Sequence, residues 1–236
     1  MIDKEKSAFT LAEVLITLVI IGVVAALTIP TAISKYRKTT VETRVKASFS
    51  TLSNAVKRAT ADHGDIALWE IDNTEDFLNK YMLPYIRNSK GRCSDIVGGD
   101  KECQLILSNG TIWEVAAMRN FVYYVNDGLD HYYIMVKADI NGKAKPNKAG
   151  YDQFFFYIFP YASEIYNTGD YRIASSVNSP GVYYDGYNVS KDELLTNIRR
   201  GCTDTCSGGD THCRKYCTAI LARNGWKVPD DYPLNL

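Results

Sequence analysis

The sequence predicts an α+β protein in which a long N-terminal α-helix, first membrane-spanning and then amphipathic, packs on an antiparallel β-sheet head with a disulfide-stapled C-terminal helical hairpin. Three observations support this prediction. Residues 9–33 are almost entirely apolar and lead into a helical stripe, an Asn-Gly turn separates two strand-like runs near residue 109, and four cysteines gather in residues 202–217.

The composition excludes several classes of protein. Lys+Arg and Asp+Glu both total 27 in a chain of 236 residues, so the net charge is zero and no nucleic-acid partner is expected. Hydrophobic residues make up 46% and charged residues 23%, which excludes a wholly disordered chain, a collagen and a multi-span transporter. The length suits one substantial domain with an appendage.

The first element is the apolar segment at residues 9–33, whose only formal charge is Glu13. As a helix, it is long enough to cross a hydrocarbon core of about 30 Å. A permanent anchor is one interpretation. A secretory signal peptide is another, because Lys4 and Lys6 precede the apolar stretch and residues 24–26 (Val-Ala-Ala) offer a small-residue cleavage site.

Glu13 favours a third interpretation, in which the helix leaves the bilayer to enter a polymer. A carboxylate in an apolar helix is unfavourable in lipid and is usually paired or functional. The prepilin signature of type IV pilins is similar to the run Lys6-Ser7-Ala8-Phe9-Thr10-Leu11-Ala12-Glu13-Val14-Leu15-Ile16. That family includes type IV pilins and the pseudopilins of type II secretion, in which a membrane peptidase removes a short leader and the new N-terminus is methylated.

The resemblance assigns roles to individual residues. It implies a leader at residues 1–8, cleavage between Ala8 and Phe9, and N-methylation of Phe9; this chain has Ala8 where the family prefers Gly. Glu13 then lies four positions beyond the new N-terminus, and the freed ammonium of Phe9 on a neighbouring subunit would be its partner. Gly22 and Pro30 match the glycine and proline that weaken the family's helix; the three assembly residues implied are Glu13, Gly22 and Pro30.

The function implied by the resemblance is structural. It is that of a subunit of a type IV pilus-like filament or a type II secretion pseudopilus, two alternatives that the sequence leaves open. The implied partners are other pilin-like subunits and copies of itself, prepilin peptidase and an inner-membrane assembly platform. The implied location is the inner membrane, single-pass with the head outside the cytoplasm, and then a periplasmic or surface filament.

A different class also remains open, namely a signal-peptide-exported or membrane-anchored binding domain that does not polymerise. No enzyme is predicted, because the chain has no P-loop, Gly-x-Ser-x-Gly, HExxH or dinucleotide motif and its three histidines are scattered.

The second half of the N-terminal helix is predicted at residues 34–62. Its apolar residues are spaced four, four, three and four apart, which places them on one helical face that we expect to pack on the head. They are Val41, Val45, Phe49, Leu52 and Val56.

The head is predicted at residues 63–236. Strand-like runs at residues 104–108 and 111–115 flank Asn109-Gly110, the dipeptide typical of a type I′ hairpin turn. Further strands are expected at residues 121–125, 132–138 and 154–158, since these runs are rich in aromatic and β-branched residues.

A polar loop at residues 139–152 is a candidate calcium site, although no cofactor is certain. Asp139, Asn141, Asn147 and Asp152 carry oxygen ligands around a loop bent by Gly and Pro, and Ca²⁺ accepts such ligands in flexible geometry. The loop resembles the Asp-x-Asn-Gly stretch of some calcium-binding pseudopilins. The alternative is that Asn-Gly and Pro-Asn simply make turns.

The last element is a helical hairpin predicted at residues 190–225. Ser190 and Glu193 form a capping box, and Asn224-Gly225 ends the second helix. Cysteines four apart share a helix face, so antiparallel packing predicts disulfides Cys202–Cys217 and Cys206–Cys213, leaving Cys93–Cys103 as the third. A zinc site is the alternative for the four late cysteines, but export to an oxidising compartment favours disulfides.

Overall fold

The computed structural model describes residues 10–87, 89–95, 101–118, 133–160, 180–207 and 212–236. The chain divides into two compact units, residues 1–40 with Leu236, and residues 41–235. Helix α1 (Leu11–His63) contributes its first part to one unit and its second part to the other. The α+β prediction is confirmed, and α1 ends within a few residues of the expected position.

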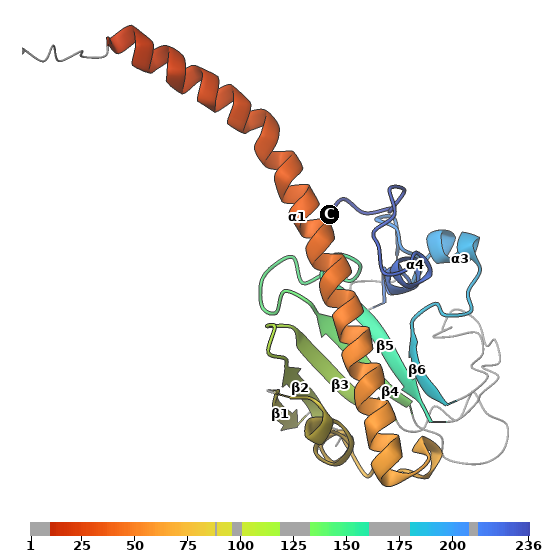
Figure 1. Cartoon of the computed structure of the whole chain (residues 1–236). Helices are drawn as coiled ribbons and strands as arrows, with labels where there is room; N and C mark the ends of the chain where they lie inside the picture. The colour runs from red at the N-terminus through yellow and green to blue at the C-terminus, as the bar shows by residue number, and fades with distance from the viewer. Residues whose placement is uncertain (1–9, 88, 96–100, 119–132, 161–179, 208–211) are drawn as a thin grey trace, which may run out of the picture. The chain divides into compact units, whose positions relative to one another are not determined.

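The second unit is built around a six-stranded antiparallel sheet in which every strand pairs with its neighbours in the chain (Figure 1). The β1–β2 and β2–β3 connections are short, as antiparallel hairpins allow, whereas the later connections are longer. The strands are β1 (Lys90–Asp95), β2 (Lys101–Ile106), β3 (Ile112–Met118), β4 (Tyr133–Asp139), β5 (Gln153–Phe159) and β6 (Gly181–Tyr184).

The β2–β3 hairpin is confirmed, but its predicted turn type is wrong. The amide of Gly110 donates to the carbonyl of Leu107, and of the residues within the turn only Gly110 has a positive φ, at 83°. This is a type I turn closed by a glycine bulge, whereas type I′ would require a positive φ at Asn109 too. Instead, the Asn109 side chain accepts a hydrogen bond from the Thr111 amide at 3.0 Å.

Of the other predicted strands, those at residues 132–138 and 154–158 are confirmed as β4 and β5. The strand predicted at residues 121–125 lies outside the described residues. The sequence does not predict β1 and β6, since β1 consists mainly of polar residues and β6 contains only four residues.

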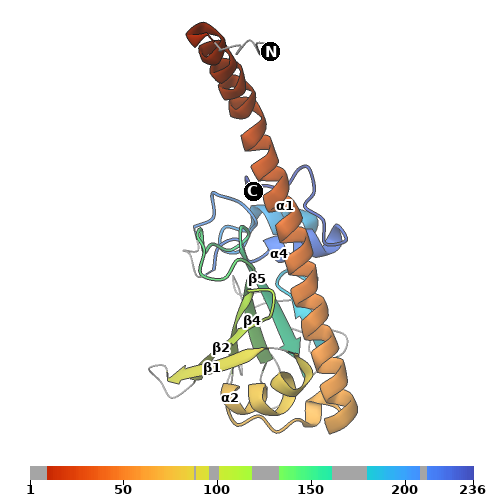
Figure 2. The ribbon, with the colours of Figure 1, turned by 60° about the vertical axis from the view of Figure 1, so that its left-hand side comes forward.

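The second part of α1 lies along one face of the sheet (Figures 1 and 2). Four of the five residues of the predicted stripe are buried, and the fifth, Phe49, packs with tilted ring planes against Phe156 of β5 and Trp226 of the C-terminal tail. The packing of this stripe on the head is therefore confirmed. Phe156 is the β5 residue whose ring contacts this stripe.

The opposite face of β5 is covered by the C-terminal part of the chain. Thr218 of α4 (Cys217–Arg223) accepts a hydrogen bond from the Phe155 amide at 3.0 Å, and the Lys215 ammonium lies 4.6 Å from the Phe155 ring centre. Because both faces are covered, six of the seven β5 residues are buried. β5 is the centre of the hydrophobic core.

Short helices complete the head. A cluster of short helices follows α1: the 3₁₀-helices at Ile66–Leu68 and Leu83–Tyr85, α2 (Thr74–Phe77) and a π-helical turn at Leu78–Met82. Another short helix, α3 (Lys191–Thr196), follows β6. The predicted Ser190 cap of α3 is present, because its hydroxyl accepts a hydrogen bond from the Glu193 amide.

The C-terminal hairpin exists, but its helices are shorter than predicted. α3 ends at Thr196 because Asn197 turns away and its side-chain oxygen accepts the amides of Arg199 and Arg200. α4 begins only at Cys217, after Arg214 adopts a positive φ of 61°. Its C-terminal end agrees with the prediction: Gly225 and Trp226 donate to carbonyls of Ala222 and Leu221 in a Schellman motif.

Candidate assembly segment and head sites

The first part of α1 presents an apolar surface whose large side chains are exposed among the described residues. Its most apolar 18-residue window has a mean hydropathy of 2.6 and is 0% buried, which meets the criteria for a membrane span by length and composition. Residues 10–33 rise by roughly 36 Å at about 1.5 Å per residue, enough to cross a hydrocarbon core of about 30 Å. An apolar surface of this size requires lipid or a protein partner.

Glu13 lies at the start of this segment in a reciprocal capping box with Thr10. The Thr10 amide and hydroxyl each donate to the Glu13 carboxylate at 2.8 Å, and the Thr10 hydroxyl accepts from the Glu13 amide at 3.3 Å. Free amides at a helix start need such acceptors. Sequence analysis missed this role, although the Thr-x-x-Glu spacing that signals it is present at residues 10–13.

Two hydroxyl groups of the segment form hydrogen bonds within the helix. The hydroxyls of Thr17 and Thr28 donate to the carbonyls of Val14 and Val24 at 2.8 and 2.9 Å. Such internal hydrogen bonds lower the penalty of placing a hydroxyl in lipid. In contrast to these hydroxyl groups, Glu13 carries a formal charge, and it is the one formally charged side chain between Thr10 and Ile33.

The predicted helix-weakening residues both lie inside α1, and the helix is continuous through them. Pro30 cannot donate a backbone hydrogen bond, and a side-chain carbon added at Gly22 would contact nothing within 4 Å. The space around Gly22 is thus open as far as the described residues are concerned. The predicted cleavage residues Ala8 and Phe9 lie outside the described residues.

Residues 31–236 match a family of unknown function, DUF6613. The chain belongs to this family. Residues 3–29 match the prokaryotic N-terminal methylation motif, so this DUF6613 member carries the prepilin signal of type IV pilin-like precursors, as the resemblance of residues 6–16 predicts. No curated protein and no solved structure matches the chain.

The structure brings the four predicted calcium ligands together in one hydrogen-bond network. Asp152 accepts the Asn141 side chain at 3.1 Å and the amides of Asn147 and Lys148 at 2.8 and 2.7 Å. When the Asn147 side-chain amide is oriented with its nitrogen toward Asp139, this nitrogen also donates to Oδ2 of Asp139 at 3.1 Å. Asp152 therefore holds the loop closed through N–H donors.

Two oxygens of this loop remain without a hydrogen-bond partner, Oδ1 of Asp139 and Oδ1 of Asn141, and both are buried. Burial raises the pKa of Asp139 to about 6. Buried acceptors of this kind normally have partners. Among the described residues, no group of three or more His, Cys, Asp or Glu side chains could hold a metal ion, so a cation here would depend on amide and carbonyl oxygens as well.

All six cysteines form disulfides, in the pairs that the spacing suggests. They are Cys93–Cys103, Cys202–Cys217 and Cys206–Cys213. One feature of the prediction is nevertheless wrong, because Cys202, Cys206 and Cys213 lie outside the helices. Cys93 faces Cys103 directly across the β1–β2 pair. With the sulfurs bonded to each other, the zinc alternative is not supported.

A buried polar cluster in the head was missed by sequence analysis. Asp185, which is 0% exposed, accepts the Tyr157 hydroxyl at 3.0 Å and pairs with Arg200 at 2.9 Å. Lys215 is buried close by, and this burial lowers its pKa to about 8. The members come from β5, the turn after β6 and the segments flanking the late cysteines, so no local sequence pattern reveals them.

Proposed function

We propose that this protein is a structural subunit of a type IV pilus-like filament or type II secretion pseudopilus, assembled through the first part of α1. The observation that carries this proposal is the exposed apolar surface of residues 10–33, most of which falls within the match to the prepilin methylation motif. The motif supports cleavage between Ala8 and Phe9 by prepilin peptidase, followed by methylation of Phe9.

The proposed mechanism assigns Glu13 a role that changes on assembly. In the single chain, its carboxylate caps the start of α1 through Thr10. Removal of residues 1–8 would create an ammonium at Phe9, and the carboxylate would then pair with the ammonium of a neighbouring subunit as the apolar helices bundle. This pairing would fix the axial register of one helix against the next.

The proposed partners are other pilin-like subunits and an assembly platform in the inner membrane. The precursor would span that membrane once with its head outside the cytoplasm. Three disulfides support this location, because such bonds persist in oxidising compartments.

The experiment that tests this proposal is intact-mass and N-terminal peptide analysis of the protein from membrane and sheared-surface fractions. We expect a chain that begins at N-methylated Phe9. A chain beginning near Leu27 would instead show an ordinary secreted domain, and an uncleaved Met1 would show a permanent anchor. Either result would overturn the filament proposal in favour of an exported or anchored binding domain.

We also propose calcium binding at the loop of residues 139–152. The supporting observation is the pair of buried, unpartnered oxygens on Asp139 and Asn141. Ca²⁺ would engage these oxygens and brace the connection between β4 and β5.

A further inference from the structure

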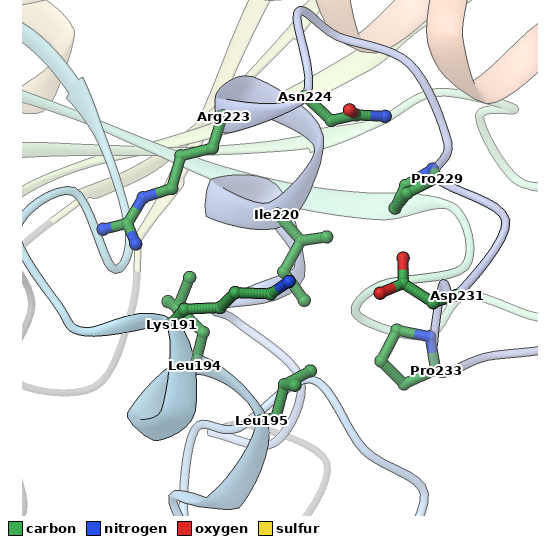
Figure 3. A pocket seen from close by; sticks show the side chains of 9 residues that line it. All are labelled: Lys191, Leu194, Leu195, Ile220, Arg223, Asn224, Pro229, Asp231 and Pro233. Carbon is green, nitrogen blue, oxygen red and sulfur yellow. The ribbon is translucent and has the colours of Figure 1, made fainter.

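A small pocket lies between α3, α4 and the C-terminal tail, all of them parts of the head (Figure 3). Its volume is about 260 Å³. Most of its lining is apolar, and the apolar residues are Leu194, Leu195, Ile220, Pro229 and Pro233. The volume falls just below the range of about 300–1,000 Å³ typical of pockets for drug-sized ligands, so the pocket suits a smaller molecule.

Two opposite charges face one another across this pocket. Figure 3 shows the Lys191 ammonium pointing toward the Asp231 carboxylate from the opposite wall. Neither side chain forms a hydrogen bond or an ion pair with any residue in the described parts of the chain. Both residues are exposed, so their charges are available to a ligand that enters from solvent.

Arg223 also lines the pocket, but its guanidinium is already engaged. Its Nη2 donates to the carbonyls of Gly186, Tyr187 and Val189 at 3.1, 2.8 and 2.5 Å. Figure 3 shows its side chain directed away from Asp231. The charge pattern offered to a ligand is therefore one ammonium and one carboxylate.

The walls of the pocket are held in place by the surrounding structure. Leu194 is 1% exposed, and its carbonyl accepts the amide of Cys202 at 2.7 Å. Cys202 is in turn bonded to Cys217 at the start of α4. A preformed pocket loses little conformational entropy when a ligand binds.

We propose that this pocket binds a free amino acid with an apolar side chain, such as leucine. Its carboxylate would pair with Lys191, its ammonium would pair with Asp231, and its side chain would pack on Leu194, Leu195 and Ile220. The charge pattern decides between a free amino acid and the end of a peptide, because either peptide terminus carries only one of the two charges. This proposal is independent of filament assembly.

The test is an NMR titration of the full-length chain in detergent micelles, with labelled Leu and Ile methyl groups and unlabelled L-leucine as the probe. We expect saturable shifts of the Leu194, Leu195 and Ile220 methyl signals. N-acetyl-L-leucine and L-leucine amide each lack one charge and should bind at least about tenfold more weakly.

Substitutions at the charged residues provide the second arm of the test. Lys191→Gln and Asp231→Asn should each weaken L-leucine binding at least about tenfold, a loss of about 1.4 kcal/mol. The matched controls Lys57→Gln and Asp230→Asn remove exposed charges that do not line the pocket and should leave binding unchanged. Unchanged thermal midpoints in all four variants would establish that each is folded.

Two results would overturn the proposal. One is the absence of methyl shifts at these three residues up to the solubility limit of leucine. The other is equal binding of leucine and N-acetyl-leucine, which would show that the pocket recognises the apolar side chain without the zwitterion.

Discussion

Asp185 and Arg200 form an ion pair that is almost completely shielded from solvent, with exposed fractions of 0% and 5% and an N–O distance of 2.9 Å. Asp185 lies just after β6, and Arg200 lies in the turn between α3 and Cys202, the first of the four disulfide-bonded cysteines near the C-terminus. The pair thus joins the sheet to the disulfide-bonded segment. Its Tyr157 partner extends the same connection to β5.

We expect Arg200→Met to lower the free energy of unfolding by about 3–5 kcal/mol, because it leaves the Asp185 charge buried without its cation. Denaturant unfolding of the full-length chain in micelles, followed by tryptophan fluorescence, measures this loss. The double variant Asp185→Leu/Arg200→Met removes both charges, so its free energy of unfolding should fall by less than that of Arg200→Met alone. A double variant that is less stable than Arg200→Met would contradict the interpretation that the unpaired charge causes the loss.

The lowered pKa of Lys215 leads us to expect that the stability of the fold depends on pH. This pKa falls to about 8 in the folded protein, from an ordinary value of 10.5. Between these values the unfolded chain binds more protons than the folded chain, so this group makes stability rise as the pH increases from about 8 toward 10.5. Below about pH 8, the group's contribution does not change with pH.

The measurement compares the wild type with Lys215→Met in chemical unfolding from pH 7 to 9.5. We expect the difference in unfolding free energy between the two proteins to change in favour of the wild type as the pH rises. Parallel curves over this range would show that Lys215 titrates normally.

Glu13→Ala should abolish incorporation into filaments while leaving the head folded, because the carboxylate would no longer pair with the Phe9 ammonium of a neighbour. Immunoblots of sheared surface fractions measure incorporation. Thr10→Ala is the matched control, since it removes the capping hydroxyl but keeps the carboxylate. An equal loss in both variants would assign Glu13 to helix capping alone.

Calcium should raise the thermal unfolding midpoint of the full-length chain relative to a chelator, since a ligand that binds only the folded state stabilises it. Asp139→Asn should reduce this increase, while Asp72→Asn, at an exposed position outside the loop, should retain it. A midpoint that does not respond to Ca²⁺ or chelator would remove the calcium proposal. The loop would then be a turn closed by Asp152.

Local patterns predicted the elements whose structure depends on nearby residues. The stripe from Val41 to Val56 predicted the helix face that packs on the sheet, because helix burial follows a 3.6-residue period. Asn109-Gly110 located the hairpin, and Ser190 located the start of α3. The turn type was wrong because the Asn109 side chain bonds the Thr111 amide, a choice that the dipeptide alone does not specify.

The C-terminal segment shows where local patterns fail. A side-chain carbon on Gly201 would lie 2.5 Å from the Asn197 carbonyl, so the chain turns at a point where the sequence predicts a continuing helix. The cysteines still pair as expected, since a short antiparallel connection brings them together in helices and turns alike. The pairing follows from spacing, whereas the path of the chain before Cys202 is set by the Asn197 side chain and by the close approach of Gly201 to the Asn197 carbonyl.

The sequence by itself determined the apolar segment, the prepilin motif, the amphipathic face of α1 and the number of cysteines, because each is encoded within a short stretch of chain. Only the tertiary structure decided which distant groups share a low-dielectric environment. The buried polar cluster forms when β5 pairs with β6 and the C-terminal segment packs on the sheet; its members are Tyr157, Asp185, Arg200 and Lys215. The walls of the Lys191–Asp231 pocket are also brought together by folding. The physical reason is that hydrogen bonding and burial act through space, so residues far apart in sequence become partners only once the chain has folded.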